Sequence, residues 1–262
     1  MPESTEGLMH ALEDIAKKAG DVALQYFGRP LSVERKEDGS PVTNADRAVE
    51  DCIRAWIESH FPHDGIVGEE RGALRESASR RWLVDPIDGT KSFLCGVPLW
   101  GVMIGVASGD RMLAGAINCA GTGDIVVAAA GCGCWHNGRL TRVSGINQLG
   151  DATVLATDDR FREHPDRIPR WSALASQAAI ARTWGDCYGY VLVATGRADV
   201  MVDDRLNPWD AAPLIPIISE AGGCFTDWNG ETSIEMGDGI ATNAELAVTA
   251  RRALGLTIAG DR

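Results

Sequence analysis

Hydrophobic and polar positions follow two different periods along this chain, and together they predict a mixture of helices and strands. Apolar residues recur every three or four positions over 8–27 and over 46–61, which predicts two amphipathic helices. Residues 34–41, between these helices, are polar and rich in turn formers, so we expect a mobile loop there. Shorter apolar runs then predict strands at 81–85, 100–107, 112–119, 124–130 and 139–144.

After about Leu149 the pattern changes to an alternation of strands and helices. We expect strands at 153–156, 198–202, 224–226 and 240–242, and helices at 168–179, 185–195, 209–220 and 244–254. Pro216 lies inside one of these helices and should kink or loosen it. The change of pattern predicts an α+β lobe over 1–148 and an α/β lobe over 149–262.

One apolar run, Trp82-Leu83-Val84, ends in the sequence Asp85-Pro86-Ile87-Asp88-Gly89-Thr90. A buried strand of this kind would deliver two carboxylates to a turn whose backbone Pro86 stiffens. Gly89 would let backbone amides approach an anion, and a helix starting near Thr90 would add its positive end. Hard oxygen ligands beside an anion-binding turn indicate metal-assisted phosphate chemistry.

A solvated turn would also explain a lone Asp-x-x-Asp, but two further acidic clusters favour a metal site. The run Ile66-Val67-Gly68 leads into the paired acids Glu69 and Glu70, and Asn207-Pro208-Trp209-Asp210 opens a predicted helix. Three element ends therefore each present a carboxylate, which is how a two-metal site is commonly assembled.

These motifs, together with the segment Glu220-Ala221-Gly222-Gly223, resemble the inositol monophosphatase family of Mg-dependent, typically lithium-sensitive phosphatases. The resemblance covers about Leu8 to Leu254. It implies an α+β/α/β fold, a layered α-β-α-β-α sandwich of the inositol monophosphatase/fructose bisphosphatase type. Haloacid-dehalogenase phosphatases are excluded by spacing, because their two aspartates are two residues apart whereas Asp85 and Asp88 are three apart.

The resemblance also implies a set of metal ligands. Glu69, Asp85 and the carbonyl of Ile87 would hold a first Mg²⁺. Asp85 would bridge to a second Mg²⁺, also held by Asp88 and Asp210. A third, loosely held Mg²⁺ is implied at Glu70, so that two or three ions per subunit are expected.

The same resemblance assigns roles around the attacking water. Asp46 would accept a hydrogen bond from Thr90, and with Glu69 this pair would orient and deprotonate the water. Asp46 also occupies a capping box that starts at Thr43, and a carboxylate has enough lone pairs for both roles. The phosphate group would be bound by Asp88, Gly89 and Thr90.

Three positions bear on the substrate. Histidinol-phosphate phosphatases of the family resemble this chain at Gly185-Asp186 and at the acidic residue Asp203, seven places before Asp210. Histidinol phosphate carries an ammonium and an imidazole, which these carboxylates would bind, whereas inositol offers only hydroxyls. Asp186 is also a favourable residue for a helix start. Trp184 and its aromatic neighbours are expected in the core or an interface rather than against substrate.

Inositol monophosphate, a sugar bisphosphate and an adenosine bisphosphate remain alternative substrates, although the acidic pair Asp203-Asp204 disfavours a second phosphate. A non-catalytic binding member of the fold is a further alternative. Every expected metal ligand is present, which favours an enzyme.

Net charge and composition indicate which classes of partner the protein is expected to bind. The net charge of −12 disfavours nucleic acid and anionic membranes, and no apolar run is long enough for a membrane span. Seven cysteines without regular spacing, and an amino terminus lacking a signal-peptide pattern, lead us to expect a cytoplasmic protein. Cys132 and Cys134 fit a strand before an Asn-Gly hairpin better than half of a zinc site. The resemblance implies a homodimer.

Overall fold

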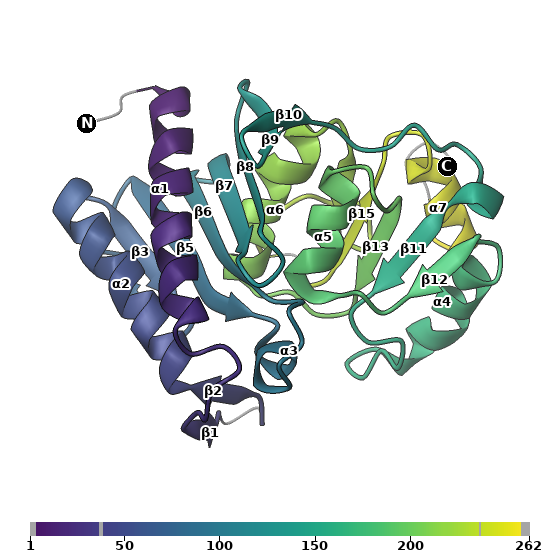
Figure 1. The fold of residues 1–262 in the computed structure, drawn as a ribbon. Coiled ribbons are helices and arrows are strands. Elements are labelled where there is room, and N and C mark those ends of the chain that lie inside the picture. Colours follow the sequence, from purple (N-terminus) through teal and green to yellow (C-terminus); the bar gives the residue numbers. More distant parts are fainter. Residues whose placement is uncertain (1–3, 37–38, 236, 258–262) are drawn as a thin grey trace.

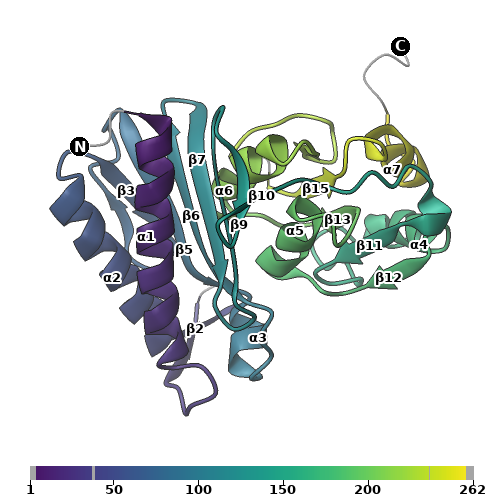
Figure 2. The same cartoon turned by 45° about the horizontal axis from the view of Figure 1, so that its top comes forward.

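The computed structural model describes residues 4–36, 39–235 and 237–257, and in them layers of helix and sheet alternate. Helices α1 (Thr5–Leu24) and α2 (Asn44–His60) cover one face of an eight-stranded sheet (Figure 1). Helices α5 (Asp186–Ala194) and α6 (Pro208–Glu220) lie between that sheet and a five-stranded one (Figure 1). Helices α4 (Ile168–Ala175) and α7 (Ala247–Ala253) lie on the far side of the second sheet (Figure 2). The predicted α-β-α-β-α sandwich is confirmed.

The two N-terminal helices are α1 (Thr5–Leu24) and α2 (Asn44–His60). Both start at side-chain caps: Ser4 Oγ accepts from the Gly7 N–H at 3.1 Å, and Thr43 forms the predicted capping box with Asp46. Their apolar stripes are buried against the large sheet, as the periodicity predicts.

The large sheet has the strand order β10-β9-β8-β7-β6-β5-β3-β4 and is mainly antiparallel, with β3 parallel to β5. Asn137 and Gly138, at φ 49° and 75°, form the predicted hairpin turn between β9 and β10. The sheet's strands are β3 (Gly65–Gly68), β4 (Gly72–Leu74), β5 (Arg80–Asp88), β6 (Gly101–Ser108), β7 (Arg111–Cys119), β8 (Asp124–Ala129), β9 (Gly133–His136) and β10 (Arg139–Thr141).

The second sheet has the order β12-β11-β13-β15-β14, and its strands are β11 (Thr153–Ala156), β12 (Ile180–Arg182), β13 (Val200–Asp203), β14 (Cys224–Thr226) and β15 (Gly239–Thr242). The helices around it are α4 (Ile168–Ala175), α5 (Asp186–Ala194), α6 (Pro208–Glu220) and α7 (Ala247–Ala253), with short 3₁₀ turns at Leu149–Asp151 and Pro165–Arg167. The helix expected over 168–179 ends four residues early, and β12, which was not predicted, follows. Its three residues are exposed or half-buried, so it has no hydrophobic alternation.

The loop expected over 34–41 is partly a strand pair. Strands β1 (Val33–Arg35) and β2 (Pro41–Thr43) pair antiparallel, with Val33 opposite Thr43. Residues 37–38 of the predicted loop lie outside the described residues. All of β1 is exposed, which explains why its polar sequence indicated a loop.

Helix α6 runs without interruption from Pro208 to Glu220, although Pro213 and Pro216 lie inside it. The helix is therefore continuous at Pro216, where the sequence predicts a kink or a loosening. Two sheet glycines let this helix approach closely, because a Cβ on Gly115 would lie 2.4 Å from Pro213 O and one on Gly105 would lie 2.7 Å from Ala212 Cβ. Packing against the sheet stabilises the helical conformation of α6, although Pro213 and Pro216 have no backbone N–H to donate.

Among the helices of the described residues, none is both long and apolar enough to cross a lipid bilayer.

Candidate active site

Two neighbouring parallel strands bring the first acidic residues together. Gly68 at the end of β3 pairs with Val84 in β5, and the Glu69 N–H donates to Val84 O at 3.1 Å. Because parallel strands end at the same edge of a sheet, Glu69 and Asp85 lie next to each other. The sequence motifs predicted both residues, and the strand register explains why they meet.

The last residues of β5, from Asp85 to Asp88, depart from regular strand pairing. Asp85 Oδ1 accepts a hydrogen bond from the Ile87 N–H at 2.9 Å, and pairing with β6 shifts register between Asp85 and Asp88. Gly89 follows at φ 81°, in the left-handed region, and α3 (Thr90–Leu94) starts at the next residue. The predicted helix start is present. The predicted turn is found only at Gly89, because Asp85 to Asp88 remain in β5 as an irregular stretch of the strand.

Asp210 reaches the same place from the first turn of α6. Its Oδ2 accepts from the Asn207 N–H at 2.7 Å, which fixes the side chain. Its Oδ1 is buried and has no hydrogen-bond partner among the described residues. Oxygens of Asp85, Asp88 and Asp210 all lie within 4.8 Å of one another. A buried, unpaired carboxylate oxygen within such a trio fits a metal ligand.

The electrostatics of the trio also favour a bound cation. Burial, reinforced by the neighbouring acids, raises the pKa of Asp85 well above its usual range. Burial and then the charge of Asp210 raise the pKa of Asp88 to about 7, and burial raises the pKa of Asp210 to about 7. A divalent cation would relieve this repulsion, and an all-oxygen ligand set suits Mg²⁺. Cys132 and Cys134 join no comparable group in the described part of the chain.

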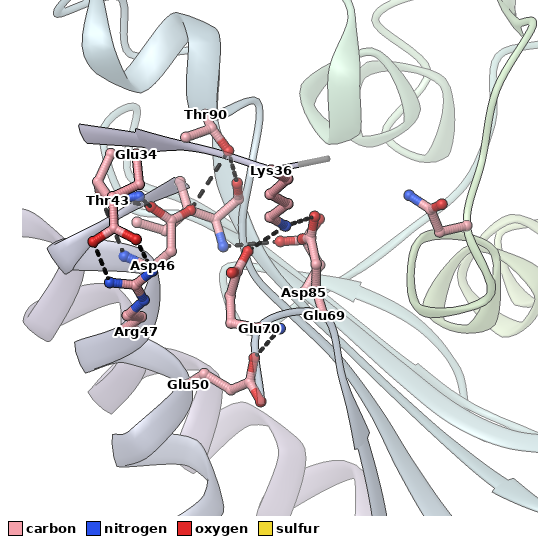
Figure 3. A network of polar contacts seen from close by, with 12 residues as sticks. Glu34, Lys36, Thr43, Asp46, Arg47, Glu50, Glu69, Glu70, Asp85 and Thr90 are labelled. Atoms are coloured by element: carbon pink, nitrogen blue, oxygen red, sulfur yellow. Dashed lines mark hydrogen bonds and ion pairs between the residues drawn. The ribbon is translucent and has the colours of Figure 1, made fainter. Parts of the chain in front are cut away.

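Lys36, which no sequence motif indicated, provides a cation beside the first predicted metal ligand. Its Nζ lies 2.7 Å from Glu69 Oε1 and 2.5 Å from Glu70 Oε1 (Figure 3). Burial opposes the charge of Lys36, but the two glutamates outweigh it and raise its pKa. The expected metal ligand Glu69 and the weaker candidate Glu70 therefore share one positive charge.

Glu50, also not predicted, holds this acidic segment in place. Its carboxylate accepts from the Glu70 N–H at 2.7 Å and the Arg71 N–H at 3.1 Å (Figure 3). A Cβ on Gly68 would lie 2.1 Å from Glu50 Oε1. The glycine before the paired acids is thus required for close approach of Glu50.

Asp46 and Thr90 lie as expected from the resemblance (Figure 3). Asp46 Oδ2 accepts from the Thr43 N–H at 2.8 Å and the Thr43 hydroxyl at 2.6 Å, which is the capping role. Its Oδ1 lies 3.5 Å from Thr90 Oγ1, which is 3.0 Å from Ile87 O. Each oxygen of Asp46 therefore serves a different partner, and both roles considered from sequence are geometrically compatible.

A second group of acids lies in the same cavity, which has a volume of about 250 Å³ and is lined by the metal-site trio as well as by Thr157, Asp186, Tyr190 and Asp203. Burial raises the pKa of Asp203 to about 7, although hydrogen bonds from Thr157 and Tyr190 lower it. Burial and then Asp88 raise the pKa of Asp186 to about 7. These carboxylates extend the negative cavity beyond the metal trio.

Comparison with known proteins identifies the family of this chain. The model of the inositol monophosphatase family matches residues 5–257. The chain belongs to this family. A histidinol-phosphatase of Chlorobaculum parvum is 45% identical, with 91% of this chain and 92% of that protein covered. An inositol-1-monophosphatase of Mesorhizobium japonicum is 32% identical, with 90% and 91% covered.

The crystal structure of the extragenic suppressor protein suhB from Bartonella henselae superimposes on this chain with a TM-score of 0.90. The two are 29% identical, with 96% of this chain and 100% of that chain covered. As a member of the inositol monophosphatase family, the chain is a phosphoric monoester hydrolase, and the family is metal-dependent.

Within this family member, the aromatic residues near Asp186 differ in role. Tyr190 is 1% exposed and donates its hydroxyl to Asp203 Oδ2 at 2.8 Å, so it is a core residue that also holds a cavity acid. Trp184 is 42% exposed. Gly185 is packed against Thr157, because a Cβ on Gly185 would lie 2.1 Å from Thr157 Cα.

Proposed function

We propose that the protein hydrolyses L-histidinol phosphate to L-histidinol and phosphate in an Mg²⁺-dependent reaction. The observation that carries this proposal is the pair Asp186 and Asp203, which lie in the same cavity as the metal-site trio. The relative from Chlorobaculum parvum, named for this activity, supports the proposal by its 45% identity.

The cationic groups of L-histidinol phosphate suit the two carboxylates, Asp186 and Asp203, that lie in the cavity outside the metal-site trio. L-histidinol phosphate carries an ammonium group and an imidazole that can be protonated, and both can donate hydrogen bonds to carboxylates. Inositol would leave these two acids, one buried and one half-buried, without a cation, at a cost in desolvation. Asp186 and Asp203 are therefore proposed as the residues that bind the cationic end of the ester, with Gly185 allowing their close placement.

Glu69, Asp85 and the Ile87 carbonyl are proposed to hold one Mg²⁺, and Asp85, Asp88 and Asp210 a second. Bound Mg²⁺ would act as a Lewis acid on the phosphate oxygens and lower the pKa of a bound water. Glu70 is proposed to hold a third ion weakly. The orphaned Oδ1 of Asp210 supports this ligand set.

The chain's own residues would then position the reactants. Thr90, hydrogen-bonded to Asp46 Oδ1, would orient the attacking water, and Glu69 would accept its proton. Backbone amides of Gly89 and Thr90 at the start of α3, with Asp88 beside them, would bind the phosphate group. Water attacks phosphorus directly in this scheme, so no phosphoenzyme forms.

A cytoplasmic homodimer is proposed as the working state. All seven cysteines are free thiols, which is typical of a reducing compartment. Ile180 begins the edge strand β12 and Trp184 lies two residues after it, and each is 42% exposed, so a second copy could cover them. Light scattering of the purified protein would give the mass of two chains if this is correct, and that of one chain if it is wrong.

The activity is tested by phosphate release in the presence of Mg²⁺. L-histidinol phosphate, inositol 1-phosphate, fructose 1,6-bisphosphate and adenosine 3′,5′-bisphosphate are compared by kcat/KM, with EDTA as control. We expect the histidinol ester to be preferred by at least about tenfold, with turnover lost in EDTA. Preference for inositol 1-phosphate would instead support the activity for which the Mesorhizobium japonicum relative is named.

A further inference from the structure

One hydroxyl holds the backbone of Asp186, one of the two proposed specificity acids. Thr157 follows the last residue of β11, and its Oγ1 accepts a hydrogen bond from the Asp186 N–H at 2.8 Å. Thr157 also lines the cavity beside Asp203 and lowers the pKa of that acid, since polar hydrogens near a carboxylate favour its charged form. It therefore holds the backbone of Asp186 directly and lies in the same cavity as the second acid.

The backbone of Asp186 needs such a contact. Asp186 has φ 52°, in the left-handed region that residues with a side chain rarely adopt. Its own N–H is held by Thr157, and the next N–H, of Cys187, donates to Asp88 Oδ2. The strained residue is thus fixed on one side by Thr157 and on the other by a predicted metal ligand.

This conformation decides where the Asp186 carboxylate lies. A Cβ on Gly89 would be 3.2 Å from Asp186 Oδ2, so the carboxylate lies against the turn proposed to bind phosphate. Asp203 approaches from β13, which pairs with β11 directly, and α5 packs against both strands (Figure 1). Thr157 stands where these three elements meet.

We propose that Thr157 is a positioning residue that sets substrate specificity, because its hydroxyl holds the left-handed backbone of Asp186 and so places the Asp186 carboxylate for the cationic end of the substrate. This inference rests on the proposed function. Thr157 itself does not contact the reacting atoms in this role, and it acts through Asp186.

The test compares variants that differ in one oxygen. Thr157→Val replaces the hydroxyl by a methyl group of similar size, and Thr157→Ser keeps the hydroxyl. Steady-state kinetics with Mg²⁺ are measured for L-histidinol phosphate and for p-nitrophenyl phosphate, which carries no cation. If Thr157→Val does not fold, Thr157→Ala and Thr157→Ser provide a second pair that differs in the same oxygen.

For Thr157→Val we expect KM for L-histidinol phosphate to rise about tenfold, with KM for p-nitrophenyl phosphate changed less than about twofold. Thr157→Ser should restore KM for L-histidinol phosphate to within about threefold of the wild-type value. Equal losses on both esters, no loss on either, or a failure of serine to restore KM would each overturn the proposal.

The substrate preference of the wild-type enzyme distinguishes a failure of the Thr157 proposal from a failure of the proposed function. If wild type shows no preference for L-histidinol phosphate over esters of neutral alcohols, the proposed function is wrong and the specificity role of Thr157 falls with it. If wild type shows the preference and Thr157→Val retains it, only the role of Thr157 is overturned.

Discussion

At the scale of single residues, the dominant feature of this protein is negative charge gathered in one cavity. Asp85, Asp203 and Asp210 are buried and Asp88 and Asp186 are half-buried, and all five line the same space. Each has a raised pKa, with burial as the main cause. Such an arrangement is costly in an empty cavity and favourable around cations.

Asp88→Asn should abolish most phosphatase activity while leaving the fold intact. The amide keeps the size of the side chain and removes the negative charge proposed to hold Mg²⁺, so we expect kcat/KM to fall by at least about a hundredfold. Circular dichroism should match wild type. Asp51→Asn is the matched control, since this acid is exposed on α2 and paired with Arg71. Near-normal turnover in Asp88→Asn would contradict the metal assignment.

Asp186→Asn should change the preference among substrates rather than the overall phosphatase activity. Loss of a carboxylate near the ammonium or imidazole should raise KM for L-histidinol phosphate by about tenfold or more, because a charge-assisted hydrogen bond is replaced by a neutral one. Hydrolysis of p-nitrophenyl phosphate should change little. If both esters lose equally, Asp186 serves the helix start rather than the substrate.

The contributions of residues to this site differ in how well sequence predicts them. Asp85 and Asp88 belong to one short motif and Asp210 to another. The family resemblance and the position of these motifs at element ends predicted that the three side chains would lie close together. Lys36, Glu50 and Thr157 have no such signal. Each contacts the site through residues far away in sequence, and a lysine in a polar loop or a threonine after a strand is common in any chain.

At the scale of elements, close packing of α6 on the large sheet carries Asp210 to the metal trio. The helix can lie this close because Gly105 and Gly115 have no side chains beneath it. Its boundaries were well predicted from Asn207-Pro208 and Gly222-Gly223. The sequence also predicted one helix across Pro216, with a kink or a loosening there, and tertiary packing offsets the local preference of Pro213 and Pro216 against a helix.

Gly115→Ala tests this packing. A Cβ would meet Pro213 O at 2.4 Å, so the helix must shift and we expect the free energy of unfolding to fall by about 1–3 kcal/mol. Activity should fall as well, because Asp210 moves with α6. Urea unfolding and phosphate release measure the two effects.

Gly145→Ala is the control for this substitution, since Gly145 is exposed and a Cβ there meets nothing within 4 Å. It should change stability by less than about 0.5 kcal/mol. Equal stability of the two variants would contradict a role for the glycine in seating α6.

Short elements were the ones that sequence patterns missed. Strands β1 and β12 each have three residues, and none of these residues is buried. A strand of this kind shows no alternation of apolar and polar positions, and only pairing with a neighbour reveals it. The long strands β6 and β7, by contrast, were predicted to within one residue at each end.

At the scale of the whole molecule, the clustered acids couple metal binding to pH. Asp88 and Asp210 have pKa values of about 7 against 3.8 for an ordinary aspartate. Metal-free protein should therefore lose stability as pH rises from about 4 to about 7, because ionisation is unfavourable only in the folded state. Mg²⁺ should restore stability most at the upper end of this range.

Calorimetry in buffers with different ionisation enthalpies tests this coupling. Since Mg²⁺ displaces protons from carboxylates, binding at pH 7 should release about one proton or more per chain, and affinity should rise between pH 6 and pH 8. Asp88→Asn should release fewer protons than the wild type. Proton-free binding with an affinity independent of pH would show that these acids are already ionised without metal.

The central claim is that one acidic cavity holds both the metal ions and the cationic end of the substrate. The most direct test is a crystal structure with Mn²⁺, L-histidinol and phosphate, in which anomalous scattering locates the metal. We predict Mn²⁺ on Asp85, Asp88 and Asp210 and the ammonium or imidazole of L-histidinol on Asp186 and Asp203. Metal absent from the trio, or L-histidinol bound away from both acids, would contradict the account.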